Sequence, residues 1–186
     1  DHRIGGTLPI SGGHMAAAGT RRQAERGITD SVEAHLADIR RISGGTVRED
    51  LVRTVVENAA ETVDWLDGLG FRFAPETPRI IYGHEPYTTP RTYYGVDEAV
   101  SILEVYERVL AGATATGRLE LWKNAPVIEL LTDAGGVTGV TVLRDGQDVR
   151  VNARHVVLAT GGFAAEPELF QELEGAPLVS AAHPTS

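Results

Sequence analysis

The chain has no cysteine among its 186 residues, which excludes disulfides, thiolate zinc sites and thiol nucleophiles. It has no apolar run of about 18 residues and no signal-peptide pattern at its start, so we expect no membrane span and a cytoplasmic location. Basic residues are few, 17 against 26 acidic ones, giving a net charge of −9. Because nucleic-acid binders usually carry a basic stripe, we expect no nucleic-acid partner.

Three glycine-rich signatures are also missing, namely GxGxxG, GxxxxGK[ST] and GxSxG. Glycine itself is abundant, with 21 residues, and it clusters at Gly5-Gly6, Gly12-Gly13 and Gly161-Gly162. The last pair follows the apolar run 155–160, which is typical of a parallel strand covered on both faces. Glycine there lets the backbone approach a phosphate or ribose. The alternative is a strand–helix turn that only needs positive φ.

Apolar periodicity predicts three helices in the first two thirds of the chain. The first has Asp30 as N-cap and Glu33 at the capping-box spacing, and the second repeats this box with Thr46 and Glu49. The third spans about 97–116. The opening loop and the segment 71–95, rich in proline and aromatic residues, predict irregular and short extended structure.

Beyond Gly117 the pattern becomes strand-like. Residues 119–122 alternate, and 127–151 predicts an antiparallel meander because Asp145-Gly146 is a strong hairpin signal. A short helix is predicted over 167–173 after the glycine pair. Helices, a meander and a buried parallel-type strand together indicate an α/β fold.

Two strings carry a family resemblance: GGTLPISGGHMAAAGT at 5–20 and HVVLATGGFAAEPELF at 155–170. With TDS at 29–31 and VDWL at 63–66, they resemble the fumarate reductase and succinate dehydrogenase flavoproteins, nearest the soluble fumarate reductases and 3-ketosteroid dehydrogenases. The resemblance implies a partial Rossmann-like FAD-binding domain. In this interpretation residues 1–186 form the central part of that domain. The N-terminal GxGxxG unit of the family and its C-terminal substrate and capping region are not in this sequence.

The resemblance implies FAD contacts made chiefly by the backbone. The first GG pair would lie near the pyrophosphate, with Thr7 and Leu8 continuing toward the flavin and residues 11–13 along the isoalloxazine. Val127 would lie at the adenine, and 160–162 near the ribose and pyrophosphate. The implied residues are Gly5, Gly6, Thr7, Leu8, Ser11, Gly12, Gly13, His14, Val127, Thr160, Gly161 and Gly162.

Two of these positions depart from family patterns. Thr7 stands where membrane-type relatives carry a histidine that bonds covalently to the flavin, so the resemblance implies non-covalent FAD. His14 stands where soluble relatives commonly have glycine. It could donate to substrate or tune the flavin, or simply point into solvent.

The aromatic loop offers further candidates: His84, Glu85, Tyr87, Arg91, Tyr93 and Tyr94. Arg91 could clamp a substrate carboxylate with its planar guanidinium, or belong to an ordinary surface loop. His2, His35 and His155 lack partners at metal-ligand spacing, so the sequence predicts no metal site. It assigns no catalytic residue.

The function predicted from these residues is that of a segment of a flavin-dependent oxidoreductase. The parent protein would move a hydride between flavin N5 and an activated C–C bond of a small organic acid or enone. Its electron-transfer partner is not specified by the sequence. The alternative is a non-catalytic nucleotide-binding or interaction module, and NAD in place of FAD fits the motifs less well.

Overall fold

The computed structural model describes residues 4–163 and 166–178. The chain separates into two compact units. We call Leu8–Ala113 the helical unit, and Asp1–Thr7 together with Thr114–Ser186 the sheet unit. Among the described residues, none of the helices combines the length and apolar character needed to cross a membrane.

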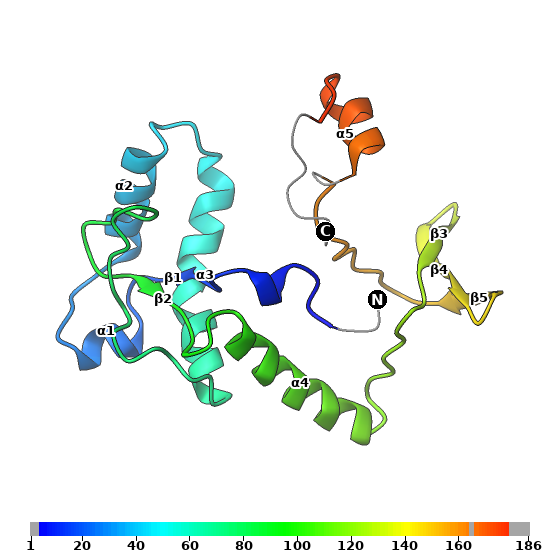
Figure 1. Cartoon of the computed structure of the whole chain (residues 1–186), viewed down its shortest axis with the longest axis horizontal. Coiled ribbons are helices and arrows are strands. Elements are labelled where there is room, and N and C mark those ends of the chain that lie inside the picture. Colours follow the sequence, from blue (N-terminus) through cyan, green and yellow to red (C-terminus); the bar gives the residue numbers. More distant parts are fainter. Residues whose placement is uncertain (1–3, 164–165, 179–186) are drawn as a thin grey trace. The chain divides into compact units, whose positions relative to one another are not determined.

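The helical unit consists mainly of α-helices and one very short antiparallel ladder. In chain order its elements are η1 (Leu8–Ile10), β1 (Met15–Ala16), α1 (Arg21–Glu25), α2 (Val32–Ile42), α3 (Glu49–Gly68), β2 (Thr92–Tyr93) and α4 (Val100–Ala115), of which the last two residues fall in the sheet unit. Helices α2 and α3 lie side by side (Figure 1). Strand β1 pairs antiparallel with β2, with Met15 opposite Tyr93. This pairing fixes the loop before β1 against the segment that ends at β2.

The core of the helical unit is built around aromatic rings from the loop that follows α3. Phe71 and Phe73 meet edge to face with centroids 4.5 Å apart, and Phe73 meets Tyr93 in the same way at 5.8 Å. Val63 and Leu66 of α3 and Ile102 and Val105 of α4 complete most of the cluster. The predicted apolar stripes therefore supply only part of the core, through Val63, Leu66 and Ile102, whereas stripe residues such as Leu51 and Val55 of α3 are exposed.

The three predicted helices are present, but both predicted N-caps are wrong. The cap of α2 is Ser31, whose Oγ accepts from Ala34 N at 3.1 Å, because the Asp30 carboxylate is taken up by an ion pair. Helix α3 starts after Arg48 without a side-chain cap, and Thr46 Oγ1 instead donates to Ser43 O at 2.8 Å. Local cap patterns give way where a side chain has a stronger partner.

The sheet unit holds the predicted meander. Strands β3 (Val127–Asp133), β4 (Gly136–Arg144) and β5 (Gln147–Asn152) pair antiparallel in the order β3-β4-β5 (Figure 1). Asp145 and Gly146 have φ of 51° and 75°, and positive φ at both residues is what a two-residue type I′ turn needs. Helix α5 (Pro167–Glu174) follows with Pro in its first turn, as predicted.

Two strand predictions in the sheet unit are wrong. Residues 119–122 and 155–160 form no strand, and Val157 is 86% exposed rather than covered. An apolar run becomes a strand only when a neighbour completes its backbone ladder. Among the described residues, no strand pairs with 155–160.

Candidate functional site

The helical unit contains a cavity of about 430 Å³ at the start of its chain. Its lining residues are Leu8, Ser11, Gly12, Gly13, His14, His84 and Ile102. The structure thus brings five of the predicted cofactor-binding residues to one cavity. It adds His84 from the aromatic loop, which the sequence offered only as one candidate among several.

Hydrogen bonds within the loop give the cavity wall its shape. Ser11 N and Ser11 Oγ both donate to Leu8 O, at 3.0 and 2.9 Å, and Gly13 N donates to Ser11 Oγ at 3.3 Å. The Ser11 hydroxyl therefore stabilises the turn that follows η1. This role explains a small hydroxyl residue here independently of any ligand.

Gly13 is required by the fold itself. Its φ is +61°, and a Cβ there would lie 2.6 Å from the Cα of Ala99, which is closer than real Cβ contacts occur. At Gly12 a Cβ would meet only the movable ring of His14, at 3.1 Å from Nε2. The resemblance attributes the need for glycine at both positions to close contact with the flavin. The structure instead attributes the need for Gly13 to its packing against Ala99, the residue before α4.

In the sheet unit a second cavity, of about 360 Å³, contains two more predicted residues. Val127 and Thr160 both line it, from β3 and from the irregular segment that precedes Gly161. The remaining lining comes from residues 128–130, Val140 and 156–159. Val127 and Thr160, predicted from separate motifs, are therefore brought together by the fold.

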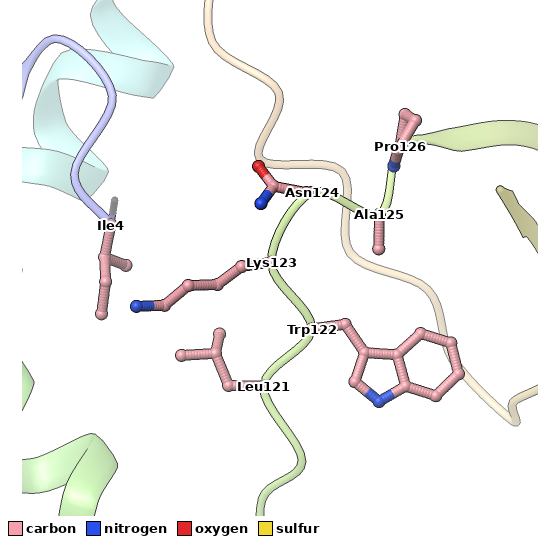
Figure 2. A pocket seen from close by; sticks show the side chains of 7 residues that line it. All are labelled: Ile4, Leu121, Trp122, Lys123, Asn124, Ala125 and Pro126. Atoms are coloured by element: carbon pink, nitrogen blue, oxygen red, sulfur yellow. The ribbon is translucent and has the colours of Figure 1, made fainter. Parts of the chain in front are cut away.

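A third hollow, also about 360 Å³, lies in the sheet unit between Ile4 and residues 121–126 (Figure 2). In Figure 2, Leu121 and Lys123 project toward Ile4, whereas Trp122 projects to the opposite side. Trp122 stacks under the Arg144 guanidinium at 4.2 Å. The segment is tied to the meander because Leu143 N donates to Pro126 O at 2.9 Å.

The glycines of the two loops fit a phosphate-bearing cofactor. A Cβ on Gly6, Gly161 or Gly162 would meet no atom of the described residues within 4 Å, the two chain neighbours apart. Gly6 and Gly161 also have positive φ, of +53° and +81°. Backbone that is open on the Cα side can be approached closely by a phosphate. These two loops therefore leave room for the pyrophosphate of FAD, as their open backbone does not obstruct it; the same openness occurs at other glycines, such as Gly44 and Gly68.

Arg91 is not an exposed carboxylate clamp, and its loop is not an ordinary surface loop at this point. Its side chain is completely buried and forms a two-sided ion pair. Nε and Nη2 donate to the two Asp30 oxygens at 2.7 and 2.8 Å, and Nη1 donates to Asp38 Oδ2. Burial opposes the Asp38 charge, but hydrogen bonds from Arg41, Thr88 and Arg91 hold the pKa of its carboxyl well below its usual range. The arginine is thus committed to the fold.

His35 lies beside this cluster and is buried without a polar partner. Its ring meets Tyr87 edge to face at 5.1 Å, and neither ring nitrogen has a hydrogen-bond partner among the described residues. Burial, followed by the Arg91 charge, lowers the pKa of His35 from 6.5 to about 4. The native chain therefore holds this imidazole neutral.

This buried histidine predicts a loss of stability in mild acid. Between pH 7 and 5 the unfolded chain protonates His35 and the folded chain does not, so the free energy of unfolding should fall by about 2 kcal/mol. Urea unfolding at the two pH values measures this. His35→Phe keeps the ring contact and loses no hydrogen bond, so its stability should depend much less on pH. An equally steep pH dependence in His35→Phe would contradict the assignment.

The chain is similar to known flavoproteins in both fold and sequence. The fold matches a solved flavocytochrome c3 fumarate reductase in its open conformation, with a TM-score of 0.80, 25% identity, and coverage of 98% of this chain and 32% of that one. The architecture is therefore that of part of a flavoprotein's FAD domain. Residues 1–184 match the family model described as "FAD binding domain", and the chain belongs to this family.

Two curated relatives illustrate the similarity. The acrylate reductase flavoprotein subunit of Shewanella woodyi is 30% identical over 170 residues, covering 87% of this chain and 32% of the relative. The 3-oxosteroid 1-dehydrogenase of Comamonas testosteroni is 47% identical over 62 residues, 32% of this chain and 11% of the relative. The chain thus spans about a third or less of the length of these proteins.

Proposed function

We propose that this chain supplies FAD-binding residues to an oxidoreductase that moves a hydride between flavin N5 and an activated C–C bond. The substrate class is a small unsaturated carboxylate or an enone, and FAD is held non-covalently. The observation that carries the proposal is the open backbone at Gly6, Gly161 and Gly162, at the positions where the family resemblance assigns the pyrophosphate. The names of the relatives, which refer to acrylate, fumarate and 3-oxosteroids, support the substrate class.

The roles of this chain's residues are to bind and orient. FAD, when bound, supplies the redox chemistry. In the sheet unit, the backbone at Gly6 and Gly161 provides N–H donors without an obstructing side chain, and Val127 provides the adenine-facing backbone next to Pro126, which lacks an N–H. In the helical unit, the wall from Leu8 to His14 offers a small, shaped surface to the ring system. Thr7 offers no imidazole for a covalent link.

Gly162→Val tests the proposal with little risk to folding. The space beside Gly162 is empty in the chain, so the new side chain should leave stability unchanged but obstruct the pyrophosphate. The variant is made in the full-length protein that contains this segment. We expect its FAD affinity to fall by about tenfold or more, which corresponds to about 1.4 kcal/mol of binding free energy. Flavin fluorescence titration after removal of bound FAD measures this affinity.

Gly68→Val is the matched control, because the space beside Gly68 is equally open but lies at the end of α3. Its FAD affinity should equal that of the unsubstituted protein.

Acid precipitation should release the flavin into the supernatant, as expected for a non-covalent cofactor. A purified protein without flavin absorbance, and without affinity for added FAD, would refute the proposal. Flavin binding without reduction of an electron-accepting dye by any tested substrate would favour the non-catalytic module.

A further inference from the structure

Three metal-ligating side chains meet in the helical unit. His14 precedes β1, and His84 and Glu85 lie in the loop before β2. One ligand atom from each of the three lies within 4.8 Å of the other two. The imidazole rings of His14 and His84 meet edge to face at 5.7 Å, and His84 Nδ1 is 3.6 Å from Glu85 Oε1. The sequence predicts no metal site, since His2, His35 and His155 lack partners at metal-ligand spacing. His14 and the pair His84-Glu85 are far apart in the chain and meet only in the folded structure.

We propose that His14, His84 and Glu85 bind a divalent transition-metal ion of the zinc type. Two imidazoles and one carboxylate form a ligand set that suits Zn²⁺ and leaves at least one coordination position for water or another ligand. Tetrahedral ligand atoms about 2 Å from a cation lie about 3.3 Å apart, so these atoms, up to 4.8 Å apart now, must approach by up to about 1.5 Å. His14 and His84 are both exposed, so rotation of their side chains can provide this approach.

The backbone holds the three residues in register. The ladder between β1 and β2 positions His14, because its neighbour Met15 lies opposite Tyr93. His84 N donates to Ile81 O at 3.0 Å, closing the turn that presents His84 and Glu85. Thr92 Oγ1, on β2, donates to Glu85 Oε2 at 2.5 Å. A hydrogen bond of this kind orients a ligating carboxylate and leaves its other oxygen available.

The location indicates what such an ion could contact. His14 and His84 both line the 430 Å³ cavity of the helical unit. In the flavin-free chain, a cation on these side chains would have its remaining coordination positions open to water in that cavity; with FAD bound, it would lie beside the flavin ring that we propose for the same wall. The ion would thereby add a positive charge to a wall whose other lining residues are uncharged.

The test is a calorimetric titration of ZnCl₂ into the chain, without flavin, without a histidine tag, and after dialysis against a chelator. We expect one equivalent to bind with a micromolar dissociation constant. His14→Ala, His84→Ala and Glu85→Gln should each weaken binding by about tenfold or more, and Thr92→Val, which removes only the orienting hydrogen bond, should weaken it as well. Circular dichroism confirms that each variant is folded.

His155→Ala is the matched control, since His155 is an exposed histidine of the sheet unit outside the cluster. Its affinity for Zn²⁺ should be unchanged. Absence of binding in the unsubstituted chain, or binding that persists in both His14→Ala and His84→Ala, would overturn the proposal. Because no flavin is present, this outcome is separate from the fate of the FAD proposal.

Discussion

Arg91→Ala should destabilise the helical unit by about 3–5 kcal/mol. The substitution leaves Asp30 and Asp38 buried without their common cation, and Asp30 is as fully buried as Arg91. Removal of one partner from a buried ion pair costs far more than the pair contributes, because the remaining charge cannot be hydrated. Urea unfolding followed by far-UV circular dichroism at pH 7 measures the loss.

Two companion variants separate the effect of the buried charges on stability from the effect of the lost side-chain volume. Arg48→Ala removes an exposed pair with Asp50 and should change the free energy of unfolding by less than about 1 kcal/mol. Arg91→Leu combined with Asp30→Asn and Asp38→Asn removes the buried charges together and should recover much of the stability lost in Arg91→Ala. An Arg91→Ala protein as stable as Arg48→Ala would contradict the structural role of this cluster.

Gly13→Ala should destabilise the helical unit by about 2–4 kcal/mol, the combined cost of a positive φ and of overpacking. A Cβ would approach the backbone of Ala99 to 2.6 Å, and backbone at the start of α4 cannot rotate away as a side-chain tip can. The loop that lines the 430 Å³ cavity must therefore shift. Thermal and urea unfolding measure the destabilisation.

Gly44→Ala is the control for Gly13→Ala. Its φ of +62° is nearly the same, but a Cβ at Gly44 would meet no atom within 4 Å. It should therefore cost only about 1–2 kcal/mol, which is the conformational contribution alone. Equal losses in the two variants would show that Ala99 does not crowd Gly13.

The elements that the sequence predicts correctly are those encoded by neighbouring residues. Apolar spacing of three and four residues identifies α2, α3 and α4, and the Asp145-Gly146 turn identifies the hairpin between β4 and β5. The N-cap at Asp30 fails because the deciding interaction, with Arg91, comes from a distant part of the chain. The predicted strand at 155–160 fails for a related reason, since strand formation depends on a partner and not on the apolar run itself.

The same distinction between local patterns and distant contacts applies to the candidate site. The sequence by itself determined the α/β class, the glycine loops and, through its motifs, the membership of an FAD-binding family, because these depend on local spacing and residue type. Tertiary structure alone decided that His84 joins His14 at one cavity, that Thr160 lies with Val127, and that Arg91 is buried between two carboxylates. Each of these facts joins residues far apart in the chain. Such contacts depend on how the elements pack, and no local pattern encodes that packing.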